Sequence, residues 1–216
     1  LWNDFISQSK NGTFLFNRSF MDYHKDRFED YSLMVFKDEK LVAVLPANRV
    51  EDKLFSHQGL TYGGLVISKK LKLHHFIDVF KTILKFLDSN HFTTLNLKLI
   101  PSIYTSLPSD ELDYLLFLTK SKLYRKDTLS VVVLDEQIKF SKDRLVGYKK
   151  GVKHGLEVRE VDGFEEFWNA ILIPNLKSKH DVNPVHSLEE ITLLKQQFPK
   201  KIRQFNVYSD NKIVAG

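Results

Sequence analysis

A twelve-residue segment that occurs twice constrains the fold of this chain more than any other feature. Its copies match at a constant offset, without a gap: Leu33-Met-Val-Phe-Lys-Asp-Glu-Lys-Leu-Val-Ala-Val44 and Phe205-Asn-Val-Tyr-Ser-Asp-Asn-Lys-Ile-Val-Ala-Gly216. In each copy apolar β-forming residues flank a short polar turn, which predicts a β-hairpin. The identical pairs are Val35/Val207, Asp38/Asp210, Lys40/Lys212, Val42/Val214 and Ala43/Ala215. We interpret the repeat as a duplicated structural unit; the alternative is that two unrelated hairpins share a pattern common to hairpins.

The first copy lies near the start of the chain and the second is its last segment, which predicts that the second unit has only begun where the sequence stops. We therefore expect a piece of a longer protein. Its first domain would cover residues 1–140, and residues 141–216 would begin a second. A hydrophobic content of 43% is enough for a full core.

The composition excludes several kinds of site. The chain has no cysteine, so it has no disulfide, thiol nucleophile or cysteine-based metal site. We predict no metal site, because His74 and His75 point in different directions from a helix and no carboxylates accompany them at ligand spacing. There is no apolar run of membrane-spanning length and no signal-peptide pattern, so we expect a cytoplasmic protein. The formal charge of +5 is compatible with an anionic ligand, a phosphate-bearing substrate or RNA.

Periodicity and capping residues predict an alternation of helices and strands. An apolar stripe at helical spacing predicts an amphipathic helix over residues 71–89. Ser187 and Glu190 have capping-box spacing, which predicts a helix that ends before Pro199. A further helix is predicted to begin at Ser109, and two more over residues 141–154 and 164–173, the last of them broken at Pro174. Strands are predicted over residues 94–100, 128–134, 156–161 and 202–208. This order is typical of mixed sheets with helices on their faces, in an α/β or α+β fold.

Several segments resemble one protein family. They are Val182-Asn-Pro-Val-His-Ser-Leu-Glu-Glu-Ile191, preceded by Lys179-His180 and followed by Phe198-Pro199; Gly59-Leu-Thr-Tyr-Gly-Gly-Leu-Val66; and Tyr148-Lys-Lys-Gly-Val-Lys-His-Gly155. Together they resemble the FemAB-like proteins, tandem relatives of the GNAT N-acyltransferase fold. The resemblance covers nearly the whole chain. It implies a GNAT-like mixed sheet flanked by helices, followed by the start of a second GNAT-like domain.

The resemblance also implies an activity, the transfer of an acyl group from acyl-CoA, such as acetyl-CoA, to an amine. The acceptor would be a small molecule or a cell-envelope, peptidoglycan-precursor-like compound. One alternative is a Fem-type peptidyltransferase that uses aminoacyl-tRNA, although the coiled-coil arm that some Fem proteins use for tRNA is absent. Another is a non-catalytic module that binds a phosphorylated ligand.

The sequence departs from the family at the donor site. The first copy has no Gln/Arg-x-x-Gly-x-Gly turn, and the corresponding region carries His57-Gln-Gly59 and Tyr62-Gly-Gly64 instead. The second copy ends before such a turn. We therefore expect the first domain to be degenerate and to shape the substrate site.

Candidate site residues come from both halves. Gly63 and Gly64 beside Tyr62 would let a ligand approach the backbone closely, whereas a bulged strand edge explains the glycines equally well. His57 is a candidate acid or base, and the alternative is a surface histidine. His180 and His186 belong to the family pattern, but His186 also precedes the capping Ser187 and would then only shape the start of the helix.

A basic segment supplies the candidate anion-binding residues. Lys149 and Lys153 share one side of the predicted helix, with Arg144 nearby. These side chains would hold a phosphate or an RNA backbone, and the alternative is a solvated basic face. The candidates are Arg144, Tyr148, Lys149, Lys150 and Lys153.

Overall fold

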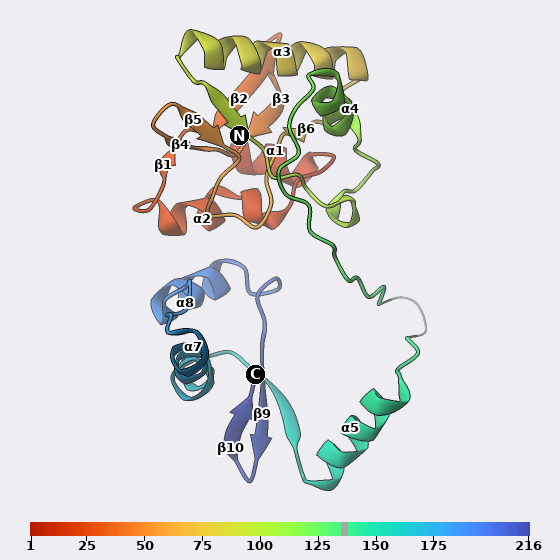
Figure 1. Ribbon diagram of the computed structural model, residues 1–216, viewed down its shortest axis with the longest axis vertical. Helices are drawn as coiled ribbons and strands as arrows, with labels where there is room; N and C mark the ends of the chain where they lie inside the picture. The colour runs from red at the N-terminus through yellow and green to blue at the C-terminus, as the bar shows by residue number, and fades with distance from the viewer. Residues whose placement is uncertain (135–137) are drawn as a thin grey trace. The chain divides into compact units, whose positions relative to one another are not determined.

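The computed structural model describes residues 1–134 and 138–216 and contains two compact units (Figure 1). Unit 1 is Leu1–Tyr124 and unit 2 is Arg125–Gly216. Both mix helices with β-strands, so the α+β class is confirmed at this coarse level. The predicted domain boundary between residues 140 and 141 stays a prediction. Among the described residues no helix has the length and apolar character needed to cross a membrane.

Unit 1 contains two sheets. One has the strand order β1-β4-β5-β7, with β5 and β7 parallel, and the other has the order β2-β3-β6. The helices and 3-10 turns are α1 (Trp2–Gln8), η1 (Phe14–Phe16), α2 (Arg18–Met21), η2 (Asp22–His24), α3 (Leu73–Ser89), η3 (Ser102–Tyr104) and α4 (Glu111–Leu118). The strands are β1 (Glu29–Asp30), β2 (Leu33–Lys37), β3 (Lys40–Leu45), β4 (Asn48–Val50), β5 (Lys53–Phe55), β6 (Val66–Ile67) and β7 (Thr94–Asn96).

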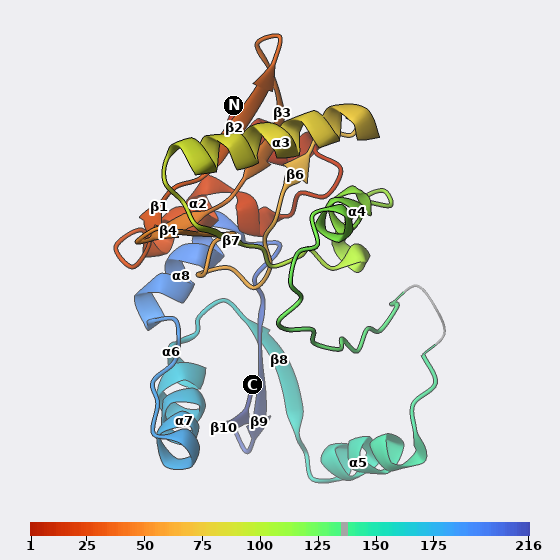
Figure 2. The same cartoon turned by 45° about the horizontal axis from the view of Figure 1, so that its top comes forward.

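The core of unit 1 lies on both faces of β3. Ala43 and Leu45 pack with the buried stripe of α3, which crosses the sheets as an amphipathic helix (Figures 1 and 2). Val44, which points the other way because strand side chains alternate, packs with α1 and α2 through Ile6 and Met21. The helix predicted over 71–89 is thus confirmed, and burial on both sides explains the unbroken apolar run of β3.

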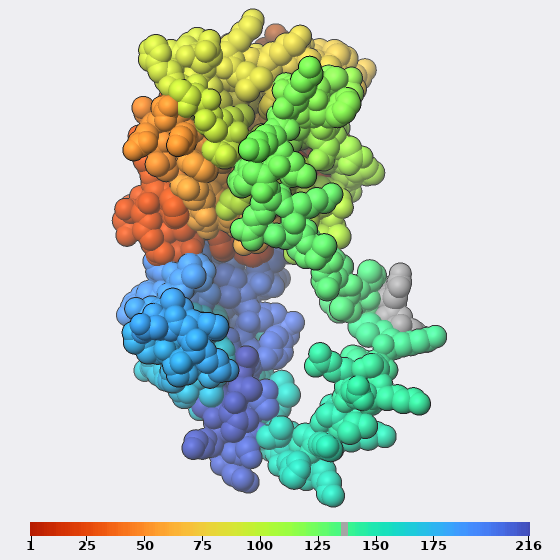
Figure 3. Space-filling view, viewed as in Figure 1, coloured from red at the N-terminus to blue at the C-terminus, as the bar shows by residue number. Residues whose placement is uncertain are grey.

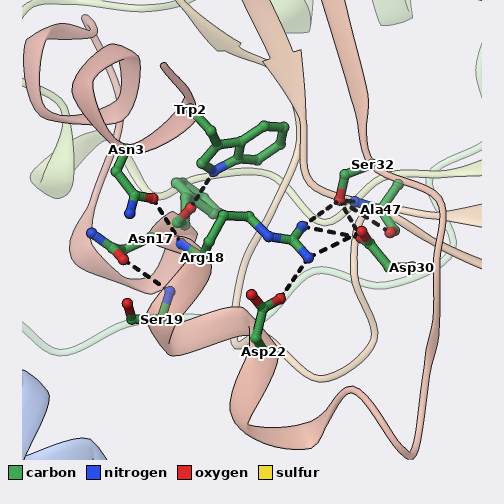
Figure 4. Close-up of polar contacts among 10 residues, drawn as sticks. Trp2, Asn3, Asn17, Arg18, Ser19, Asp22, Asp30, Ser32 and Ala47 are labelled. Atoms are coloured by element: carbon green, nitrogen blue, oxygen red, sulfur yellow. Dashed lines mark hydrogen bonds and ion pairs between the residues drawn. The ribbon is translucent and has the colours of Figure 1, made fainter.

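Arg18 joins the N-terminal helices to β1 (Figure 4). Its guanidinium donates to both carboxylate oxygens of Asp30, at 3.2 and 3.0 Å, and to Asp22 at 2.5 Å. It also lies over the Trp2 ring, 5.7 Å from the centroid. Burial raises the pKa of the Asp30 carboxyl, but the hydrogen bonds and charge of Arg18 outweigh it and bring the pKa below its usual value. This bidentate contact holds α2 against the strand.

Unit 2 has a sheet of order β10-β9-β8, with antiparallel pairing throughout. The helix predicted over 141–154 and the capping box of Ser187 and Glu190 are confirmed. Its helices are α5 (Lys142–Lys153), α6 (Glu165–Phe167), the π-helical η4 (Trp168–Leu172), α7 (Ile173–His180) and α8 (Leu188–Gln197). Its strands are β8 (Glu157–Val161), β9 (Gln204–Ser209) and β10 (Lys212–Ala215).

Some sequence predictions are wrong. The strand predicted over 94–100 is shorter, because β7 covers only Thr94–Asn96. Residues 128–134 form no strand, because no neighbouring strand pairs with them, and the three valines Val131, Val132 and Val133 are exposed. The helix that begins after Phe164 does not break at Pro174 but continues to His180. Proline cannot donate to the carbonyl four residues earlier, and the widened π-helical turn just before it accommodates the missing bond.

Both repeated segments are hairpins, as predicted, and they agree in detail. The turn residues Asp38 and Glu39 have φ of 48° and 61°, and the equivalent Asp210 and Asn211 have 48° and 60°. Two positive φ angles are the signature of a type I′ turn. The pairing register also shifts at the same point, so that Val42 in one hairpin and Val214 in the other is the unpaired residue of a β-bulge.

Candidate functional site

A row of buried polar side chains lies along one face of β9. Gln204, Asn206 and Tyr208 alternate along the strand and therefore point to the same side. Asn206 is only 1% exposed. A buried amide is stable only when it is hydrogen-bonded, and this one is bonded on both sides. Its Oδ1 accepts from Gln204 Nε2 at 2.8 Å, and its Nδ2 donates to Tyr208 OH at 3.1 Å.

The row ends at a carboxylate. Tyr208 OH donates to Glu166 Oε2 at 2.6 Å, so every donor in the sequence from Gln204 to Glu166 points toward the acid. Aligned donors polarise one another and stabilise the charged end. Glu166 Oε1 has no hydrogen-bond or ion-pair partner among the described residues. One oxygen is therefore fixed by the sheet while the other stays available.

Glu166 borders a pocket of about 530 Å³ within unit 2. The walls come from the end of β8, from α6, from the π-helical turn and from β9; they are Val161, Gly163, Glu165, Glu166, Asn169, Ala170 and Asn206. The lining thus has two carboxylates and two amides, and no basic side chain. Its volume is in the range of small-molecule sites.

The π-helical turn gives the pocket one wall. Asn169 and Ala170 lie in this turn, and Pro174 follows it directly in α7. α6 and the turn pack against the β9–β10 hairpin (Figure 2). Single π-helical turns inside helices often occur at functional sites. Here the proline explains why the turn forms, and the turn sets which residues face the pocket.

Trp168 holds this wall to the start of α8. Its ring is buried and packs edge-on against Phe164 and Phe167, with centroid distances of 5.6 and 5.9 Å. Its indole N–H donates to the carbonyl of His186 at 3.3 Å. Ser187, the next residue, caps α8. Trp168 is thus a core residue of unit 2.

Tyr62, Gly63 and Gly64 lie inside unit 1. Tyr62 is a core residue whose hydroxyl donates to Thr13 at 3.1 Å and whose pKa is raised by burial. A Cβ on Gly63 would lie 2.1 Å from the carbonyl oxygen of Ser56, and Gly64 has a φ of +88°. The chain's own backbone therefore accounts for both glycines, which lie outside the strands of unit 1.

His57 is not a surface histidine. Only 3% of the residue is exposed, and its ring stacks on that of His24 with centroids 5.1 Å apart. Burial, followed by the nearby His24, lowers the pKa of His57 to about 4. Its Nδ1 is buried without a hydrogen-bond partner in the described part of the chain. The imidazole is therefore neutral near pH 7.

The basic candidates all lie on α5, which has no buried residue. Nearly all α5 residues are exposed, and Figure 3 shows this teal segment with its side chains open to view. Within residues 1–134 and 138–216, no carboxylate pairs with Arg144, Lys149, Lys150 or Lys153. Tyr148 is exposed among them. This is the geometry of a solvated basic face rather than of a pocket.

His180 and His186 lie at two helix ends. His180 is the exposed last residue of α7. His186 directly precedes the N-cap of α8 and accepts the Trp168 hydrogen bond through its backbone carbonyl. Its observed contribution is thus to the start of the helix. The described residues bring neither histidine into the pocket lining.

Sequence reasoning missed the residues of the pocket. The available signal was the polar alternation Gln204, Asn206 and Tyr208 in a predicted strand, opposite the apolar Phe205 and Val207. A polar face on a strand that also has an apolar face indicates either solvent or a polar site. No sequence pattern indicated that Glu166, far earlier in the chain, would complete it.

No protein-family model matches the chain, and no curated protein matches it significantly. The FemAB-like resemblance therefore stays a prediction. In the described residues, no group of three or more His, Asp or Glu side chains is placed to hold a metal ion.

Proposed function

We propose that this protein is an N-acyltransferase of the FemAB-like GNAT class. It would transfer an acyl group from acyl-CoA to an amine of a small molecule or a cell-envelope precursor. The observation that carries the proposal is the matching pair of hairpins, which share the turn conformation, the register and the position of the bulge. A tandem pair of related units is the architecture expected of that class.

The helices before each hairpin support the same reading. In unit 1 the indole of Trp2 donates to the carbonyl of Phe16 at 2.7 Å, and Asn17 then caps α2. In unit 2 the indole of Trp168 donates to the carbonyl just before Ser187, the cap of α8. Tryptophan, cap and hairpin thus follow one another in the same order in both units, at spacings that differ only slightly. A common order with two short length differences favours duplication over two unrelated hairpins.

The third strands of the two sheets differ. β3, the second strand of its hairpin, pairs with β6, whereas β9, the first strand of its hairpin, pairs with β8. The two hairpins therefore share the turn, the register and the bulge but not the edge to which the third strand is added.

Unit 2 carries the polar site in this proposal. The residues of unit 1 that correspond to Asn206 and Tyr208 are Met34 and Phe36, which cannot form the hydrogen-bonded row. Both are exposed. This difference supports the expectation that the first domain is degenerate, and it favours unit 2 as the site of the acceptor.

The pocket suits the acceptor rather than the donor. CoA carries phosphates, and the two carboxylates among the lining residues would repel them. Acyl transfer requires an amine that is positioned and then deprotonated. A carboxylate with one fixed and one free oxygen is able to do both. Which residues would hold the acyl donor is not defined by this pocket.

Thermal denaturation of the full chain with acetyl-CoA tests the proposal. A ligand that binds only the native state raises the melting temperature, by an amount that grows with its concentration. We expect a rise with acetyl-CoA and a smaller one with desulfo-CoA plus free acetate. No shift at concentrations well above micromolar would count against an acyl-CoA enzyme.

The cations of α5, which pair with no carboxylate in the part of the chain that the structure describes, favour a second candidate, a module that binds a phosphorylated ligand or tRNA. Phosphate contacts make binding strongly salt-dependent. Fluorescence titration with a tRNA at two salt concentrations, for the parent and for Lys149→Gln with Lys153→Gln, tests it. Binding that weakens with salt and that falls further in the double variant would support this second function.

A further inference from the structure

The charge of the unit 2 pocket is unbalanced. Glu165 and Glu166 both line it, and no lysine, arginine or histidine does. Arg159 on β8 lies over the Tyr208 ring, 4.6 Å from its centroid, and donates to Glu157. Arg203, which directly precedes β9, donates to Glu160. A cleft with carboxylates of one sign concentrates ligands of the opposite charge.

The carboxylate is positioned and not merely present. Glu166 reaches Tyr208 across a sequence separation of 42 residues, and Tyr208 is supported in turn by the buried Asn206. Two of the four hydrogen-bonding positions of the Asn206 side chain are used by Gln204 and Tyr208. Glu166 is exposed, but its Oε2 is held by the Tyr208 hydroxyl, so the side chain loses part of its rotamer freedom on folding, before any ligand arrives. Preorganisation of this kind lowers the cost of binding.

We infer that this pocket binds the primary ammonium group of a small molecule. An ammonium is a compact charge with three N–H donors and no acceptor, and the lining offers carboxylate and amide oxygens. Glu166 Oε1 is the counter-charge, and the exposed amide of Asn169 provides a further acceptor. The volume of about 530 Å³ leaves room for the rest of a small molecule beyond its ammonium head.

The binding claim stands on the pocket alone. That the bound ammonium is the acceptor of the acyl group rests on the proposed function. The two claims can be tested separately. If the chain binds an ammonium ligand but does not respond to acetyl-CoA, the binding site is supported and the acyltransferase activity is not.

The test is a titration of the full, ¹⁵N-labelled chain with butylammonium chloride, followed by NMR. We expect the shifts to concentrate on the side-chain amides of Asn169 and Asn206 and on the backbone of Gly163. Butanol and butanoate, which have the same length without the positive charge, should produce no such pattern. Calcium chloride at equal concentration controls for a site that accepts any cation.

Two matched variants test whether ligand binding depends on the positioned carboxylate of Glu166 or only on the negative charge of the pocket. Glu166→Gln should weaken butylammonium binding more than tenfold, because it removes the counter-charge. Glu165→Gln removes the same charge one residue away without touching the Tyr208 contact, and should weaken binding only a few-fold. Tyr208→Phe keeps both charges and loses the hydroxyl that fixes Glu166, so we expect an intermediate loss.

Several results would overturn the inference. They are equal losses in the two glutamine variants, equal binding of butanol, a response to calcium alone, or shifts that avoid the pocket. A well-dispersed spectrum for Glu166→Gln establishes that the variant is folded. If the spectrum shows that Glu166→Gln is unfolded, Tyr208→Phe is used instead. An unchanged affinity of this variant for butylammonium would contradict the role of the positioned carboxylate.

Discussion

Replacing His57 by asparagine should remove a large part of the acid sensitivity of unit 1. The ring is buried, stacks on His24, and has a φ of 57°, in the left-handed region. Asparagine tolerates that backbone conformation better than most residues. The substitution therefore removes a titrating group with little added backbone strain. His91 has a φ of 62° and is exposed, so His91→Asn is a matched control.

The size of the effect follows from the pKa. The ordinary value is 6.5 and burial lowers that of His57 to about 4. Below the ordinary value the unfolded chain takes up a proton that the folded chain does not, so stability falls as the pH falls. The loss should be about 2 kcal/mol between pH ~7 and pH ~5, approaching about 3 kcal/mol near pH ~4, where the folded form also begins to protonate.

Urea unfolding of the full chain at both pH values measures this. Trp2 and Trp168 are the tryptophans of the two units, so a Trp168→Phe background makes fluorescence report unit 1. Titrating carboxylates contribute equally to parent and variants and cancel in the comparison. We expect a shallower pH dependence for His57→Asn and an unchanged one for His91→Asn. If His57→Asn kept the full dependence of the parent, the burial argument would be refuted.

Two further predictions concern backbone positions. Gly59→Ala should destabilise unit 1 by about 2 kcal/mol in thermal melts, because its Cβ would lie 2.1 Å from His24 Nε2. Gly147→Ala is the control: its Cβ would meet nothing within 4 Å, so this change should be neutral or slightly stabilising. In the paired hairpins, Glu39→Gly should stabilise by roughly 1 kcal/mol and Asn211→Gly by less, because asparagine already tolerates a positive φ. Equal or reversed gains in urea unfolding would contradict a shared type I′ turn.

Local patterns predicted much of the secondary structure. The stripe of α3, the capping box before α8 and both hairpin turns depend on residues a few positions apart, and their physical causes are local. The strand that was predicted over residues 128–134 shows the limit of prediction from local patterns. A run of valines favours a strand, but a strand exists only when another edge pairs with it.

The burial of His57 shows the same limit for single residues. Its neighbours in sequence, Ser56 and Gln58, are polar, and the pattern favoured a surface position. Its surroundings instead come from Phe28 and His24, much earlier in the chain. Which face a loop residue turns to depends on what the loop packs against, and sequence periodicity carries no information on that.

By itself the sequence determined that both repeated segments are hairpins, because their turn residues and alternating side chains specify the register locally. It also determined that thiol chemistry is excluded, since the chain has no cysteine. Only the tertiary structure decided that Glu166 meets Tyr208 and that the polar face of β9 borders an open pocket beside the π-helical turn. That contact spans 42 residues, and contacts at such a distance form only when the sheet and its covering helix pack together.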